Sequence, residues 1–127
     1  MGQQQLLLIV LGVIIVGIAV VVGINLFNAN AVSANRDGVI SDLNNLGTMA
    51  QQYYKKPSSM AGGGNTFTAW TLPGALDTTA NGTYTISVSA QSVTIVGTGT
   101  ETGDDGSEKV KATATVSPTA ITSVKNN

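Results

Sequence analysis

Few residues in this chain could do chemistry, because the sequence contains no Cys and no His. Thiolate and imidazole metal sites, a cysteine nucleophile and a Ser-His-Asp triad are therefore excluded. The most concentrated reactive groups are carboxylates, oxygen ligands of a kind that suits Ca²⁺: Glu101, Asp104, Asp105 and Glu108. We interpret this cluster as a hydrated turn, since Gly103 and Gly106 flank the two aspartates.

These carboxylates form no pair arranged for general acid–base catalysis, so we expect the protein not to be an enzyme. We expect no catalytic residue, no cofactor, no bound metal and no small-molecule substrate. The 127-residue chain carries 6 basic and 7 acidic residues, a net charge of -1, which leaves no basic face for phosphates. Nucleic acid is therefore not indicated as a partner.

The N-terminal part of the chain is apolar over a length that could cross a membrane. Residues from Leu6 to Ile24 form an unbroken run of 19 apolar residues or glycines, and no ionisable side chain precedes Arg36. At 1.5 Å per residue such a run covers about 28 Å, close to the hydrocarbon thickness of a bilayer. We therefore predict that residues 1–30 form an apolar helix that spans the membrane.

An amphipathic pattern follows this run. Its apolar residues recur at helical spacing and would line one side of a helix over residues 31–56: Val39, Leu43, Leu46, Ala50 and Tyr53. Lys55 and Lys56 suit the negative end of a helix, and Pro57 stops further winding. The sequence thus predicts one long helix over about residues 6–56.

The chain after this helix has the composition of a small β-domain. We predict a flexible, Gly-rich joint at residues 57–65 and the β-domain over 66–127. Alternating patterns predict strands at residues 84–90, 93–97 and 110–116, with a fourth either at 66–72 or at 120–124. The predicted fold is α+β, with the C-terminal half of the long helix packed on a small antiparallel sheet of three or four strands.

This order of elements resembles the type IV pilin family over the whole chain. The most specific likeness is the passage from helix to sheet, AQQYYKKP at Ala50–Pro57 followed by GGGNTF at Gly62–Phe67. The resemblance implies a major pilin: a structural subunit of a helical filament of identical copies, with roles in adhesion and motility. It also implies a precursor in the cytoplasmic membrane, handled by prepilin peptidase and the pilus assembly machinery, and then an extracellular filament.

In that family a short basic leader is removed and the new N-terminus is methylated, which implies Met1 as the cleaved and methylated residue. The charge pattern agrees with this reading, because membrane proteins keep basic residues on the cytoplasmic side. Here Arg36, Lys55 and Lys56 all follow the apolar run. We therefore expect the gene to encode a leader containing Lys or Arg before Met1.

The resemblance also implies roles within the apolar helix. The residues expected to form the filament core are Leu6, Leu7, Ile9, Val10, Val13, Ile14, Val16, Val20 and Ile24. Helix flexibility is expected at Gly12, Gly17 and Gly23, because an interior glycine costs about 1 kcal/mol relative to alanine. An uninterrupted helix there is the alternative.

Where the family usually has a glutamate at the fifth position, this chain has Gln5. A glutamate buried among helices needs a cation, whereas a glutamine needs only hydrogen bonds. We hypothesise that Gln3, Gln4 and Gln5 set the axial registration of neighbouring subunits through amide hydrogen bonds. The alternative is that these glutamines only mark the membrane interface.

Other functions for the same design stay open at this stage. A minor pilin or a pseudopilin of a type II secretion system has the same architecture. Archaeal pilins and archaellins also join an apolar helix to a Thr-rich β-domain, although the long amphipathic half favours the bacterial type. A single-pass membrane-anchored β-domain that binds a ligand and never assembles is the remaining alternative.

Overall fold

A computed structural model describes residues 2–127. Its elements, in chain order, are α1 (Gly2–Lys55), η1 (Ser58–Met60), η2 (Gly74–Asp77), β1 (Thr78–Thr79), β2 (Gly82–Val88), β3 (Val93–Thr102), β4 (Lys109–Val116) and β5 (Ile121–Lys125). These residues form two compact units, one that ends at Ala31 and one that comprises Val32–Asn127. The helix α1 contributes to both units, and the second also contains the whole sheet.

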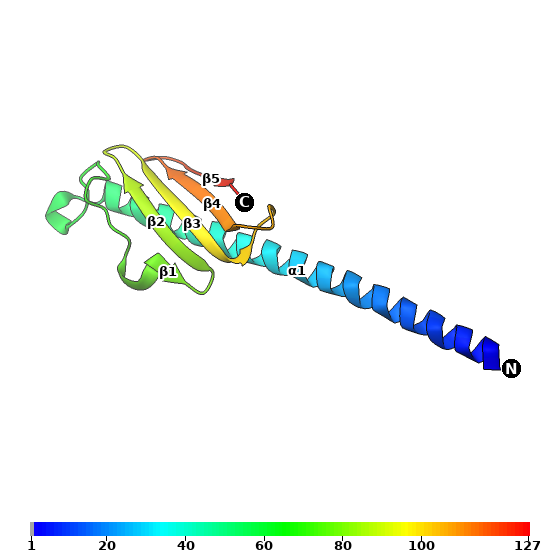
Figure 1. The fold of residues 1–127 in the computed structure, drawn as a ribbon. Coiled ribbons are helices and arrows are strands. Elements are labelled where there is room, and N and C mark those ends of the chain that lie inside the picture. The colour runs from blue at the N-terminus through cyan, green and yellow to red at the C-terminus, as the bar shows by residue number, and fades with distance from the viewer. Residues whose placement is uncertain (1) are drawn as a thin grey trace. The chain divides into compact units, whose positions relative to one another are not determined.

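The five strands form one sheet in the order β1-β2-β3-β4-β5, and every neighbouring pair is antiparallel (Figure 1). The predicted α+β fold, a long helix packed on an antiparallel sheet, is therefore confirmed. The predicted count of three or four strands is wrong, because the sheet has five. The strand that was not predicted is the two-residue β1. This strand pairs across the tight turn at Ala80–Asn81 and is too short to leave an alternating pattern in the sequence.

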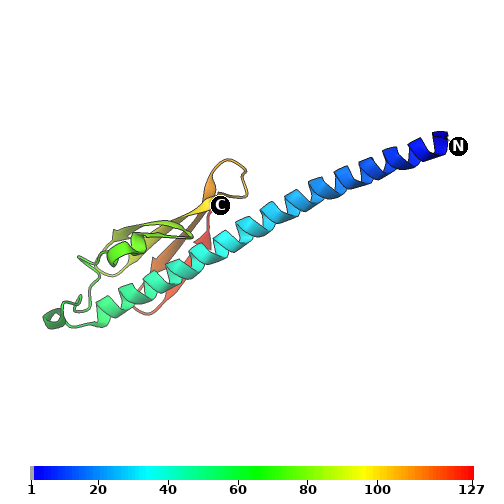
Figure 2. The same cartoon turned by 90° about the horizontal axis from the view of Figure 1, so that it is seen from below.

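The helix covers one face of the sheet (Figure 2). The strands carry apolar residues on that face, and the helix carries an apolar stripe that packs against them. On β3 and β4 the buried residues are the inward ones, among them Val93, Ile95, Ala112, Ala114 and Val116. Thr predominates at the positions between them, which face away from the core. Period-2 patterning therefore decides which side of the sheet the helix occupies.

The apolar stripe of α1 supplies the other half of this core. Val39, Leu43 and Ala50 are fully buried and Leu46 nearly so, while Tyr53 is partly buried against the same cluster. Small residues on the sheet let the helix approach closely. A Cβ added at Gly97 would lie 2.7 Å from Cγ1 of Val39, so any larger residue there would push the helix away.

The glycines after the helix cap its C-terminus, and the flexibility expected of residues 57–65 stays a prediction. The N–H groups of Gly63, Gly64 and Asn65 donate to the carbonyls of Tyr53, Lys56 and Tyr54 at 2.7, 2.9 and 2.8 Å. A Cβ at Gly63 would lie 1.9 Å from a backbone oxygen, so the chain can fold back onto the helix only with glycine there. These bonds satisfy carbonyls that a helix end otherwise leaves unpaired.

Of the two alternatives for a further strand, residues 120–124 correspond to β5 and residues 66–72 form no strand. In the second segment Ala69 has a φ of 71°, outside the β region, and Trp70 N–H donates to the carbonyl of Phe67 at 3.0 Å. This turn places Phe67 and Trp70 in the core beside the end of the helix. Aromatic burial has therefore overridden the β propensity of the segment.

Leu43→Ala should lower the free energy of unfolding of the Val32–Asn127 unit by about 2 to 5 kcal/mol, the range for deleting a fully buried leucine side chain. The measurement is denaturant unfolding of the detergent-solubilised protein, followed by the fluorescence of Trp70, which is 6% exposed. Leu43→Met is the matched control and should cost less than about 1.5 kcal/mol. Equal losses in the two variants would contradict a tightly packed stripe.

Candidate membrane and assembly surface

The unit that ends at Ala31 exposes an apolar surface on every side of α1. Every large hydrophobic residue from Leu6 to Phe27 is exposed, and the exposed fractions run from 52% at Ile14 to 78% at Phe27. Full burial of one such side chain contributes about 1.5 to 3 kcal/mol. Water is therefore a poor solvent for this segment, and lipid or other apolar helices are its favourable surroundings.

The segment is compatible with membrane insertion. Over residues 2–127, α1 is the one helix long and apolar enough to cross a bilayer. Over residues 6–24 the backbone groups pair within the helix, which is the condition for crossing hydrocarbon. The residues expected to form a filament core all lie on this exposed surface: Leu6, Leu7, Ile9, Val10, Val13, Ile14, Val16, Val20 and Ile24.

The polar start of α1 is exposed as well. Gln3, Gln4 and Gln5 lie in its first turns, and their amides are accessible to partners outside the chain. Their role in subunit registration stays a prediction. Met1 lies outside the described residues, so the cleavage and methylation expected there also stay predictions.

Gly12, Gly17 and Gly23 lie within α1, which is helical from Gly2 to Lys55. A Cβ added at any of them would meet no atom within 4 Å. Nothing inside the chain therefore requires glycine at these positions. Because glycine has no side chain, a neighbouring helix could approach α1 closely there. At about 100° per residue, Gly12 and Gly23 lie on nearly the same side of the helix and Gly17 on another.

In the unit Val32–Asn127, one polar site that joins the helix to the sheet is the carboxylate of Asp42. Its Oδ2 accepts hydrogen bonds from Tyr84 Oη at 2.6 Å, Thr79 Oγ1 at 2.8 Å and Asn81 Nδ2 at 3.0 Å. Burial alone would raise the pKa of Asp42, but these three donors outweigh it and hold the pKa below the ordinary value of 3.8. Burial, and next the bond to Asp42, raise the pKa of Tyr84.

A second polar anchor is Asn35, which lies on the side of the helix that faces away from solvent and is 9% exposed. Its Nδ2 donates to the carbonyl of Asn81 at 2.8 Å. Its Oδ1 accepts from the N–H groups of Thr100 and Glu101 at 3.0 and 3.3 Å. Sequence reasoning missed both anchors, because Asn35 and Asp42 read as part of the solvated side of an amphipathic helix.

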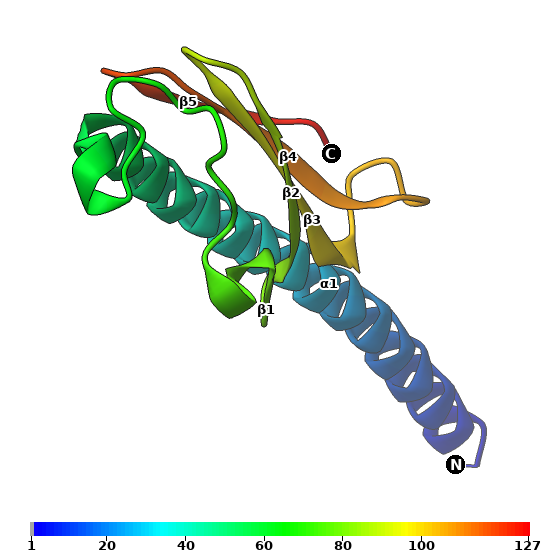
Figure 3. The ribbon, with the colours of Figure 1, turned by 90° about the vertical axis from the view of Figure 1, so that its left-hand side faces the viewer.

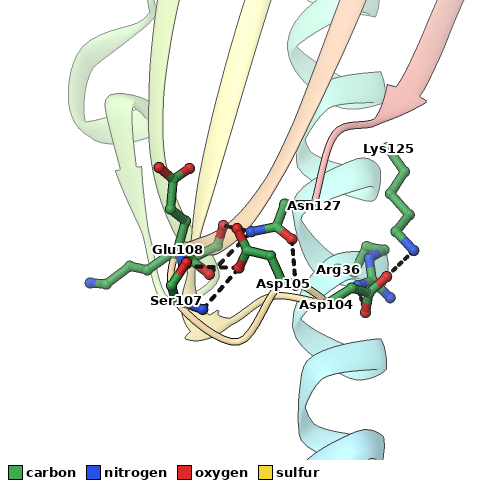
Figure 4. A network of polar contacts seen from close by, with 8 residues as sticks. Arg36, Asp104, Asp105, Ser107, Glu108, Lys125 and Asn127 are labelled. Carbon is green, nitrogen blue, oxygen red and sulfur yellow. Dashed lines mark hydrogen bonds and ion pairs between the residues drawn. The ribbon is translucent and has the colours of Figure 1, made fainter.

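The acidic cluster predicted to be a hydrated turn connects β3 to β4 (Figure 4). Asp104 forms ion pairs with Arg36 of α1, at 2.8 Å, and with Lys125 of β5. Lys125 and then Arg36 hold the pKa of Asp104 below its usual range through these bonds. Within residues 2–127 no group of three or more acidic side chains is arranged to hold a metal ion.

Asp105 organises the turn itself. Its Oδ1 accepts hydrogen bonds from the N–H groups of Ser107 and Glu108, each at 2.9 Å (Figure 4). These backbone bonds keep the pKa of Asp105 below its usual range. The two aspartates therefore serve the fold, one by pairing with cations and the other by closing the turn.

A groove of about 310 Å³ lies beside Asp42, between α1 and the residues that lead into β1. Its lining includes Asn45, Met49, Gln52, Leu76 and Thr79. Asp42 is the one titratable residue in that lining, and its Oδ2 is already engaged. The groove therefore offers apolar and amide contacts but no acid–base pair.

No protein-family model, curated protein or solved structure matches the chain. The function of the chain must therefore be inferred from its own geometry. Its most unusual feature is the apolar surface of α1 from Leu6 to Phe27.

Asp42→Asn should weaken the dependence of stability on acid pH. Because the native pKa of Asp42 lies below 3.8, its contribution is present above that value and is lost as the pH falls through the native pKa. Near pH 7 the variant should lose about 1 to 3 kcal/mol of unfolding free energy, since three donors lose a charged acceptor. Denaturant unfolding between about pH 7 and about pH 3 measures both effects.

Asp37→Asn is the matched control for this prediction, because Asp37 is an exposed carboxylate on the same helix. It should leave the unfolding free energy near pH 7 almost unchanged. If the Asp42 variant matched this control at every pH, the three hydrogen bonds would have no net role in stability.

Proposed function

We propose that this protein is the major structural subunit of an extracellular filament of the type IV pilus kind. The observation that carries the proposal is the segment from Leu6 to Phe27, apolar on every side and exposed throughout. In the membrane this segment contacts lipid, and in the filament it contacts the same segment of neighbouring copies. Each copy thus passes from the cytoplasmic membrane to the filament without exposing the segment to water.

The composition of the segment supports ordered packing. Val and Ile dominate it, and their branched side chains have few rotamers to lose when helices come together. The exposed glycines allow close contact at two sides of the helix. In this proposal prepilin peptidase and the assembly machinery act on the precursor, and the protein itself has no catalytic role.

The unit Val32–Asn127 forms the outer part of the filament in this proposal. Its own core is closed by the stripe of α1, so its stability does not depend on neighbouring copies. Minor pilins and pseudopilins would use the same arrangement, and abundance in purified filaments separates them from a major subunit.

One observation favours a different function, a membrane-anchored domain that binds a ligand. The groove beside Asp42, of about 310 Å³, reaches the lower end of the size range of ligand pockets, about 300 to 1,000 Å³. In that case the apolar segment stays in lipid and the chain remains a monomer. The two functions differ in whether copies associate through residues 6–27.

Electron microscopy of material sheared from cells that express the protein should reveal thin filaments in which this chain is the abundant subunit. Their cores should contain the N-terminal segments, because removing these apolar surfaces from water is favourable. Analytical ultracentrifugation of the intact, lipid-free chain should give large assemblies. A dispersed monomer in buffer, together with filament-free cells, would overturn the proposal and favour the anchored domain.

Gln5→Leu should reduce the yield of filaments relative to the membrane-inserted pool. The substitution removes one amide from each subunit and leaves its partner amides unpaired, at about 1 to 3 kcal/mol per buried group. Quantification of the chain in sheared and membrane fractions gives the ratio. Leu8→Ile, apolar in both forms and one turn away, is the control and should assemble normally. Normal assembly of the Gln5 variant would remove the registration role.

A further inference from the structure

The sheet has two open edges. One is β5, which pairs only with β4 among the described strands. At the other margin β1 covers only Gly82 and Thr83 of β2, so β2 is an edge strand from Tyr84 to Val88 (Figure 3). Each open edge is therefore five residues long, Ile121–Lys125 on one side and 84–88 on the other.

The hydrogen-bond pattern identifies the free groups on β5. Ser117 N–H donates to the carbonyl of Ala120, and Asn126 N–H donates to that of Lys111. Antiparallel pairs alternate between bonded and non-bonded positions, so within β5 residues 122 and 124 bond to β4. The N–H and C=O groups of Ile121, Ser123 and Lys125 therefore point out of the sheet edge.

The same reasoning applies to β2. Ser89 N–H donates to the carbonyl of Ser92, so residues 83, 85 and 87 bond to β3 and the groups of Tyr84, Ile86 and Val88 point outward. The loop over residues 65–77 runs on this side of the sheet. Its backbone bond to this region is from Phe67 to Ala90, beyond the end of the strand.

Neither open edge carries a proline, a bulge or an unpaired charge, which are features that hinder pairing with another chain. Residues 84–88 and 121–124 include no proline and no charge. The one charged residue of β5, Lys125, is held by Asp104. The one register irregularity among the described strands lies between β3 and β4, away from both edges. Val124 on β5 is 57% exposed, and in Val32–Asn127 only Met60 is a comparably exposed large hydrophobic residue.

We propose that the β5 edge of one copy pairs with the β2 edge of a second copy of this chain, so that one antiparallel sheet continues across subunits. The direction of the strands supports this partner. Neighbouring strands alternate in direction from β2 to β5, so these two edge strands are antiparallel to each other. Two copies placed side by side in the same orientation therefore bring the edges together in the antiparallel arrangement.

The side chains agree with this pairing. The residues with outward backbone groups, such as Ser123 and Ile86, all carry side chains on the helix-covered face of the sheet. If the two five-residue edges overlap fully, Ile121 lies opposite Val88 on that face. On the other face Val124 lies opposite Thr85, a β-branched pair of the kind that stabilises sheets.

Such a contact joins two different surfaces of the molecule, so it is heterologous and can repeat without limit. It therefore suits an open filament better than a closed dimer. The inference deepens the proposed filament, since it rests on that proposal for the common orientation of the copies and names a second site through which the copies bind.

Disulfide trapping in the full chain tests this pairing, because the natural sequence contains no Cys. The variant Thr85→Cys/Val124→Cys should form a ladder of covalent multimers on oxidation. Within one chain these positions are three strand spacings apart, about 14 Å, whereas a disulfide needs Cα atoms within about 7 Å. Two further variants, Val124→Cys with Thr83→Cys and Val124→Cys with Ser87→Cys, test registers in which β5 is shifted by two residues along β2 in either direction. Thr85→Cys/Thr115→Cys, which uses the inner strand β4, should remain monomeric.

The oxidation is performed on filaments and on detergent-solubilised protein, with filament formation scored by electron microscopy. A ladder from any Val124 pair and none from the β4 control supports the pairing. Filaments without a ladder from any pair overturn the edge contact and leave the filament proposal standing. A ladder in detergent from a chain that forms no filaments supports the edge contact and counts against the filament. Ladders from the β4 control as well would overturn the edge contact.

Discussion

The apolar surface between Leu6 and Phe27 must be covered by lipid or by other apolar helices, because the rest of the chain does not cover it. Within residues 6–27 the backbone of α1 is satisfied by the helix's own hydrogen bonds, but the large hydrophobic side chains have no cover within the chain. After Ala31 the same helix meets the opposite condition, because Val39, Leu43 and Ala50 are enclosed by the sheet. One continuous secondary structure therefore needs two environments, one supplied by the fold and one supplied from outside.

The enclosed half of the helix depends on polar contacts as well as on apolar packing. An apolar stripe against small sheet residues such as Ala112 and Ala114 could slide by a turn with little loss of buried area. Asn35 and Asp42 remove that freedom, since each joins the helix to a defined part of the sheet. Misplacing the helix by one turn would leave these polar groups without partners, at a cost of about 1 to 3 kcal/mol each.

The sequence contained enough information for the class of fold and for the two halves of the helix. Long periodic patterns such as the stripe at Val39, Leu43, Leu46 and Ala50 are strong signals, and the structure buries these four residues. Such patterns could not predict the number of strands or the conformation of residues 66–72. The two-residue β1 leaves no periodicity, and Phe67 and Trp70 fold into the core through a turn that β propensity does not anticipate.

The polar anchors were hidden for a different reason. Asp42 and Asn35 have neighbours such as Asp37 and Asn44 that are exposed, and no local pattern distinguishes the two groups. Their partners lie far away along the chain, from 37 residues between Asp42 and Thr79 to 66 residues between Asn35 and Glu101. Only the register between helix and sheet brings them together, so pairing of this kind follows from the tertiary structure.

Assembly through the apolar segment alone would leave the arrangement of copies weakly defined. Lipid tails are about as apolar as Val and Ile, so exchanging lipid for helix contacts supplies little directional preference. Amides at Gln3–Gln5 and backbone groups at a strand edge are directional, because a hydrogen bond is made at one distance and angle and lost at others. A filament built from this chain would therefore take its cohesion from residues 6–27 and its geometry from its polar contacts.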